Sequence, residues 1–88
     1  MEITEVKLTL RNEERLKGFA NITFDNAFVI RGLKIINGAK GLFISMPSKR
    51  RSDGSFQDIA HPINPETRKM IEEIVLDAYT NEVNGHSE

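Results

Sequence analysis

The chain has 88 residues, 28% of them charged and 39% hydrophobic, and a formal net charge of −1. These values are typical of one soluble globular domain, which buries roughly 60% of the surface that its unfolded chain exposes. Such a domain holds a sheet and a helix, but not a deep enzyme cleft with its own lid. Because the chain has no cysteine, a disulfide framework, a zinc–thiolate site and a thiol nucleophile are all excluded.

The beginning of the chain, MEITEVKL, lacks the basic and apolar regions of a signal peptide. No apolar stretch approaches the roughly 20 residues that span a bilayer. We therefore expect a cytoplasmic protein without a membrane partner.

The charges are unevenly distributed along the chain. Lys49, Arg50 and Arg51 are adjacent, whereas residues 66–88 contain six carboxylates against two cations. A nearly neutral total argues against a generally basic nucleic-acid-binding protein. It nevertheless conceals a local positive patch and an acidic C-terminal end.

Two alternating stretches near the N-terminus predict the first two strands. Residues 3–10 form the first, residues 11–17 a polar loop, and the second stretch begins at Gly18. Asp25 and Asn26 then supply turn chemistry, since both tolerate unusual dihedral angles and bond nearby backbone. The side chains expected to face the core are Val6, Leu8, Leu10, Ala20, Ile22 and Phe24.

The third predicted strand, residues 27–37, changes phase along its length. Its apolar side chains begin at Phe28 and Ile30 and shift by one position to Leu33 and Ile35. A slip at Arg31-Gly32 indicates a β-bulge, for which glycine is favoured. A strand covered on both faces is the alternative, but a chain this short hardly supplies two covers.

The remaining elements are two strands and a helix. A glycine-rich turn at residues 37–41 leads to a fourth strand at 42–46, and residues 56–60 predict a fifth strand at the edge of the sheet. Asn64 is a good N-cap, and Pro65 suits the first helical position. The helical stripe consists of Met70, Ile71, Ile74, Val75, Ala78 and Tyr79.

These elements predict an α+β fold: an antiparallel four- to five-stranded twisted sheet with one C-terminal amphipathic helix packed on it. Residues 1–80 would form one domain, and residues 81–88 a frayed tail. One helix of about four turns cannot cover all the apolar strand surface, so we expect a homodimer that associates either edge to edge or face to face. The apolar residues in surplus are Leu33, Ile35, Leu42, Ile44 and Met46.

Catalytic constellations are absent from the pattern. The histidines are His61 and His86, and the second lies in the predicted tail. Asp58 is three residues before His61, but strand geometry points the two to opposite faces, so we expect the His61 ring to bond backbone near the helix start. Ser45 and Ser48 lack the glycines of a nucleophile elbow. We therefore expect no enzyme activity, no metal site, no cofactor and no small-molecule substrate.

The basic triplet is the candidate binding site. Lys49, Arg50 and Arg51 lie on a predicted loop between the fourth and fifth strands, and a two-fold dimer would display them twice. Neutralising about six phosphates predicts a slope near −5 for log affinity against log salt. Arg31 and Arg11 on the polar sheet face extend the patch, whereas the acidic helix repels phosphate. Short basic runs also occur on many solvated loops without a binding role.

The polar sheet face is not expected to recognise RNA by base stacking. Its residues Lys7, Thr9, Asn21 and Thr23 include no exposed aromatic pair. RNA-recognition domains stack two or three bases on aromatic side chains of a sheet.

The chain resembles the SpoVG family of bacteria, named after stage V sporulation protein G. The likeness begins with MEITEV and continues through ANITFD and FVI. It is densest in GLFISMPSKR, residues 41–50, and DIAHPIN, residues 58–64. The combination of MPSKR with DIAHPIN is highly specific.

The resemblance implies a small dimeric sheet-plus-helix protein that binds DNA, and in some members RNA, as a regulator linked to septation and sporulation. Lys49 and Arg50 are motif positions of the family. After them the family commonly continues Thr-Pro-Asp-Gly, where this chain has Arg51-Ser52-Asp53-Gly54. The segment gains a cation and loses a rigid proline, which predicts higher affinity and a looser conformation.

Two hypotheses follow for the function. The first is a dimeric nucleic-acid-binding regulator that uses Lys49, Arg50, Arg51 and Arg31 for phosphate contacts. The second is a protein-interaction module of septum formation, in which the same segment binds an acidic protein partner without direct nucleic-acid binding. Base specificity depends on groove-reading side chains, which the sequence does not identify.

Overall fold

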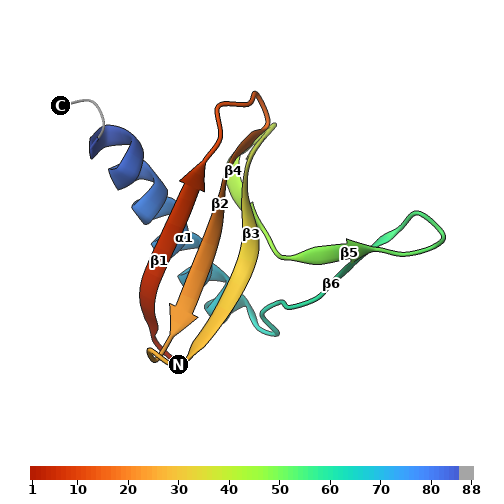
Figure 1. Ribbon diagram of the computed structural model, residues 1–88, viewed down its shortest axis with the longest axis horizontal. Coiled ribbons are helices and arrows are strands. Elements are labelled where there is room, and N and C mark those ends of the chain that lie inside the picture. Colours follow the sequence, from red (N-terminus) through yellow and green to blue (C-terminus); the bar gives the residue numbers. More distant parts are fainter. Residues whose placement is uncertain (86–88) are drawn as a thin grey trace.

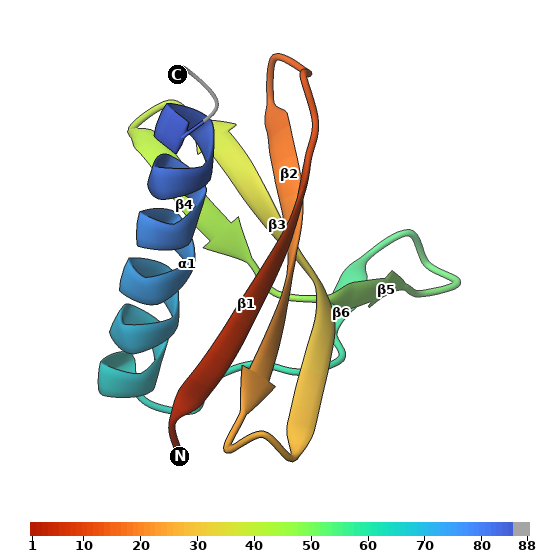
Figure 2. The same ribbon diagram turned by 60° about the vertical axis from the view of Figure 1, so that its left-hand side comes forward.

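The structure is a computed structural model in which residues 1–85 are described. Four antiparallel strands form one sheet in the order β1-β2-β3-β4, and a single helix, α1, packs across one of its faces (Figures 1 and 2). Two further strands, β5 and β6, pair only with each other. The α+β prediction is confirmed. The elements are β1 (Ile3–Leu10), β2 (Leu16–Phe24), β3 (Phe28–Gly38), β4 (Gly41–Ser45), β5 (Ser48–Arg50), β6 (Phe56–Asp58) and α1 (Pro65–Gly85).

The predicted bulge in β3 is present. Ala20 pairs with Leu33 and Ile22 pairs with Ile30, so β3 contains one residue more than β2 between these pairs. Gly32 has a φ of +83°, a conformation that glycine adopts without steric cost. The extra residue restores the phase, so that both Ile30 and Leu33 face the helix.

The turn between β2 and β3 is also as predicted. Asp25 and Asn26 both have a φ of +53°, and the Ala27 amide donates to the Phe24 carbonyl at 2.9 Å across the turn. Phe24 pairs with Phe28, so residues 25–27 connect the two strands. The turn is tied to the start of β1, because the Asp25 amide donates to the Glu2 carbonyl at 2.8 Å and the Asn26 amide donates to Thr4 Oγ1 at 2.9 Å.

The core lies between the sheet and α1. The Thr67 amide donates to Asn64 Oδ1 at 2.7 Å, which confirms Asn64 as the N-cap. Ile71 and Val75 are the buried helix residues, whereas Ile74 of the predicted stripe is exposed. The buried core comprises Ala20, Ile22, Phe24, Leu33, Ile35, Ile44, Met46, Ile71 and Val75.

The prediction of a fifth strand in the sheet is wrong. β6 covers residues 56–58 and pairs with β5 in a separate two-stranded sheet. β4 ends at Ser45, opposite Lys34, so that its next residues would face the β3 bulge. Pro47 also has no amide to donate to a ladder. Both features end the pairing of β4 with β3, and the chain leaves the sheet after Ser45.

The helix extends further than expected. It continues to Gly85, five residues past the domain boundary that the sequence suggested at residue 80. The rest of the predicted tail, with His86, lies outside the described residues. Within residues 1–85 the structure contains no helix that is both long and apolar enough to cross a membrane.

Candidate nucleic-acid interface

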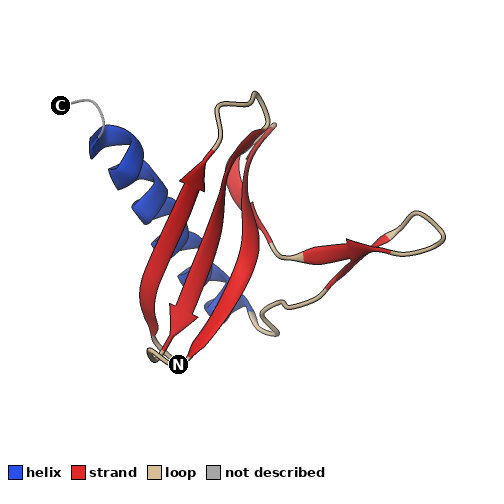
Figure 3. Ribbon diagram, viewed as in Figure 1, coloured by secondary structure: helices blue, strands red, loops and turns tan. Residues whose placement is uncertain are grey.

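The basic triplet lies on a hairpin made of β5, β6 and their turn, which we call the arm (residues 48–58). The arm projects from the body of the molecule (Figures 1 and 3), and all of its residues are exposed. At its base, the Ile59 amide donates to the Pro47 carbonyl at 2.7 Å. In Figure 2 the arm and α1 lie on opposite sides of the sheet. The arm is therefore separated from the acidic helix by the sheet.

The tip of the arm is held by Asp53. Its Oδ1 accepts bonds from the Ser55 amide at 2.9 Å and the Ser55 hydroxyl at 2.6 Å. These two bonds favour the ionised carboxylate and lower the pKa of Asp53. The Gly54 amide donates to the Arg51 carbonyl at 3.0 Å, and Gly54 has a φ of +91°. This turn gives the tip a defined shape without the proline that the family pattern has there.

The three cations do not form one patch. Lys49 pairs with Gln57 and Arg50 pairs with Phe56. Because successive side chains of a strand point to opposite faces, Lys49 and Arg50 lie on opposite faces of the arm. Arg51 follows at the turn. The prediction of a loop carrying the triplet side by side is therefore wrong, since two of the three cations belong to a strand.

Arg31 lies apart from the arm. It sits in the β3 bulge opposite Asn21, exposed on the sheet face turned away from α1, which we call the outer face. No hydrogen bond or ion pair connects Arg31 with the arm in the described part of the chain. The structure therefore separates the predicted site into the arm and one outer-face cation.

The outer face is less polar than the sequence suggested. Phe19 and Phe43 alternate with the buried residues Ala20 and Ile44, so both lie on this face. Phe43 is 40% exposed, and the Arg11 guanidinium lies 5.4 Å from the centre of the half-buried Phe19 ring. The polar residues expected on this face are therefore accompanied by Phe43, which is exposed, and by Phe19, which is half-buried next to Arg11. The signal was present in the alternation, because each of these phenylalanines directly precedes an inward residue.

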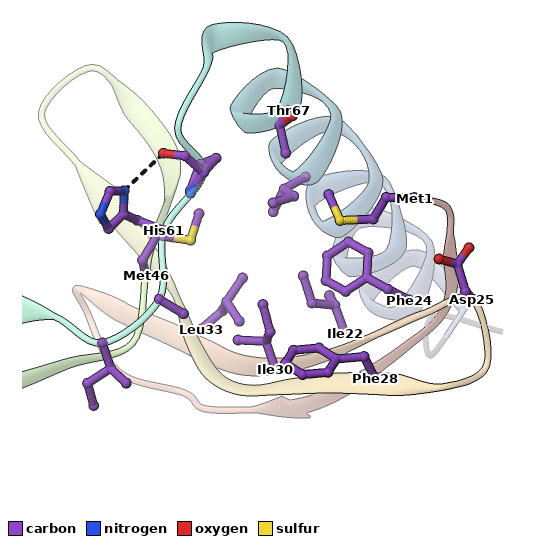
Figure 4. A pocket seen from close by; sticks show the side chains of 14 residues that line it. Met1, Ile22, Phe24, Asp25, Phe28, Ile30, Leu33, Met46, His61 and Thr67 are labelled. Carbon is purple, nitrogen blue, oxygen red and sulfur yellow. Dashed lines mark hydrogen bonds between the residues drawn. The ribbon is translucent and has the colours of Figure 1, made fainter.

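A cavity of about 500 Å³ opens on the sheet face that α1 covers. It lies between the end of the sheet that carries the β2–β3 turn and the start of α1 (Figure 4). Its lining includes Met1, Phe24, Phe28 and Ile59 and is mainly apolar. Sequence reasoning did not identify this cavity, because its walls come from segments far apart in the chain.

His61 lies at the rim of the cavity and is exposed. Its Nδ1 is 3.0 Å from the Pro62 carbonyl oxygen, which is the predicted bond to backbone near the helix start (Figure 4). Within residues 1–85, no three histidine, cysteine or acidic side chains lie close enough together to hold a metal ion.

The chain is similar over most of its length to one bacterial family. The family model SpoVG matches residues 1–81. A protein of Bdellovibrio bacteriovorus named "Putative septation protein SpoVG" is 54% identical over 88 residues, which cover all of this chain and 82% of the relative. A protein of the same name from Anaeromyxobacter sp. is 55% identical over 94% of this chain and 86% of its own length. Another from Phytoplasma australiense is 48% identical over 97% of this chain and 90% of its own length. The chain therefore belongs to the SpoVG family.

Proposed function

We propose that this chain is a small dimeric nucleic-acid-binding regulatory protein with a role in septation, and that the arm contacts phosphates. The observation that supports this most is the state of the three arm cations. In residues 1–85 no carboxylate lies within 4.0 Å of Lys49, Arg50 or Arg51, and all three are exposed. Cations held on a projecting hairpin without intramolecular partners are available to a polyanion. The role in septation rests on the names of the relatives.

The distribution of charge supports one orientation of the bound polyanion. The arm carries three cations against Asp53 and Asp58, and the Asp53 carboxylate is engaged with Ser55. Helix α1 carries five carboxylates against two cations. A phosphate backbone is therefore attracted to the arm side of the sheet and repelled from the helix side.

The dimer part of the proposal is supported by exposed apolar side chains around the cavity. The lining residues Met1, Phe28 and Ile59 are 74%, 65% and 67% exposed. Apolar surface that gathers at an open cavity marks an interaction site more often than scattered apolar residues do. A second copy covering this region would need to bury about 800 Å² per partner for a stable interface. Such a dimer would carry two arms, with six cations in total.

Fluorescence anisotropy with labelled random-sequence DNA tests the binding proposal. We expect the variant Lys49→Ala/Arg50→Ala/Arg51→Ala to lose about tenfold or more in affinity at moderate salt, because it loses several phosphate contacts. The matched control Lys40→Ala/Arg68→Ala/Lys69→Ala removes the same charge from exposed positions elsewhere. Equal losses in both variants would show that only net charge matters and would refute the arm as the site.

A second candidate function is supported by one feature of the arm. Phe56 is 71% exposed beside Arg50, and exposed aromatic and arginine side chains are enriched at the centres of protein interfaces. The arm would then bind an acidic surface of a septum protein. A wild-type protein that captures such a partner without retaining DNA, and a Phe56→Ser variant that loses this capture, would favour this function. DNA retention that disappears at high salt would favour the first.

A further inference from the structure

The shape of the arm restricts which nucleic acid it fits, if the proposed function holds. The arm is a two-stranded antiparallel ribbon, and the strands of such a ribbon lie about 4.8 Å apart. The major groove of B-form DNA is about 12 Å wide and admits a two-stranded ribbon. The arm stands clear of the sheet (Figure 1), so the body of the protein does not block its approach.

The placement of the cations matches a groove better than a single strand. A flexible strand lying along the arm would meet one face of it, and hence either Lys49 or Arg50. A groove has a phosphate backbone on each side. With the tip directed at the groove floor, Lys49 on one face and Arg50 on the other each face one phosphate wall. Cations on both faces of the arm can therefore contact both phosphate backbones of a groove at once.

The tip offers groups that base edges recognise. Arg51 has the donor geometry that binds guanine O6 and N7, and a carboxylate accepts from the cytosine N4 amine. The two bonds from Ser55 both go to Asp53 Oδ1, which leaves Oδ2 to accept another. Because these bonds lower the pKa of Asp53, the carboxylate is an acceptor at neutral pH.

We propose that the arm enters the major groove of duplex B-form DNA tip first, with Lys49 and Arg50 on opposite phosphate walls and the turn at residues 51–54 facing the bases. A-form RNA duplexes have a deep, narrow major groove that side chains cannot read. The site is therefore one for duplex DNA and excludes duplex RNA. This inference deepens the proposed function and depends on it.

Competition binding with matched nucleic acids tests the substrate class. A 20-base-pair DNA duplex, the RNA duplex of the same sequence and each single DNA strand compete for the full-length protein at one salt concentration. We expect the DNA duplex to bind about tenfold tighter than the RNA duplex, since a different groove geometry removes one wall of contacts. Equal affinity for both duplexes, or preference for a single strand, would overturn the inference but leave nucleic-acid binding intact.

Groove-specific blocking supplies a second test. DNA with glucosylated 5-hydroxymethylcytosine fills the major groove, and a minor-groove ligand such as netropsin fills the other. We expect the first to abolish binding and the second to leave it within about twofold. Binding that survives the major-groove block but falls with the minor-groove ligand would place the arm in the minor groove and overturn the inference.

Single variants show whether both faces are engaged. For each arm that is bound, Lys49→Ala and Arg50→Ala should each lower the salt slope by about one, and the double variant by about two, whereas the control Lys40→Ala should leave it unchanged. A slope that responds to only one of the two residues would show a one-faced contact and overturn the groove geometry. Absence of any nucleic-acid binding by the wild type would instead refute the proposed function itself. Thermal unfolding of each variant confirms that these exposed substitutions leave the fold intact.

Discussion

The Gly32 amide donates a 3.1 Å hydrogen bond to Asn21 Oδ1, and this bond holds the β3 bulge against β2. The bulge aligns two halves of β3 whose apolar positions differ in phase. It also marks where β4 stops, and hence where the arm leaves the sheet. A local backbone feature in the scaffold thus determines where the candidate binding surface begins.

Replacing Gly32 with alanine should destabilise the protein by about 1–2 kcal/mol, because an L-residue is strained at this positive φ. Space is not the cause, since nothing lies within 4 Å of a Cβ at this position. Urea unfolding measures the effect. The control Gly85→Ala also meets no atom of residues 1–85 within 4 Å, and there a positive φ is absent. A similar loss in both variants would contradict the backbone explanation.

The cap of α1 makes a separate contribution. Asn64→Ala should lower the free energy of unfolding by about 1 kcal/mol, since the Thr67 amide loses its acceptor. Asn64→Asp keeps an acceptor oxygen and should restore most of the stability. If the aspartate variant were as unstable as the alanine variant, the bond to Thr67 would not be the stabilising interaction.

The tip of the arm should respond to acid. The lowered pKa of Asp53 means that its bonds to Ser55 are fully present above the ordinary carboxyl value of 3.8 and are lost as pH falls through the lower folded value. The NMR shift of the Ser55 amide should therefore titrate with a midpoint below 3.8. In Asp53→Ala the amide should show no such step. A midpoint above 3.8 would contradict the observed bonding.

Self-association should depend on the cavity rim. Ile59→Lys places a charge where the proposed interface is apolar, and the dimer dissociation constant should rise by about tenfold or more. Sedimentation velocity over a range of concentrations measures it. Val83→Lys introduces the same charge at an exposed apolar residue of α1, away from this cavity, and serves as control. A wild-type protein that stays monomeric at all concentrations would refute the dimer.

The scaffold was largely predictable from the sequence, because its signals are local. The phase slip around Arg31-Gly32 predicted the bulge, and Asn64-Pro65 predicted the helix start. The length of α1 was underestimated, since residues past Tyr79 bury little apolar surface and give no periodic signal.

The sequence located the cations of the candidate site, whose role in binding stays a prediction, but it did not reveal their geometry. Charge alone identified Lys49, Arg50 and Arg51. Their orientations depend on Ser48–Arg50 being a strand, and that depends on pairing with residues 56–58 across the turn. β6 does not join the main sheet because β4 ends where Pro47 would face the β3 bulge. This pairing between distant strands is not visible in any local sequence pattern. The cavity was missed for the same reason.

The early end of β4 has a consequence for solubility. β4 pairs with β3 only from Lys34 to Gly38, so the half of β3 from Phe28 to Leu33 forms an open sheet edge next to apolar side chains. Open edges can recruit strands from other molecules and lead to aggregation. Here a twisted, irregular backbone carries the Arg31 charge in the middle of that edge, and both features discourage indefinite strand addition. The same irregularity that releases the arm therefore also protects the sheet from polymerising.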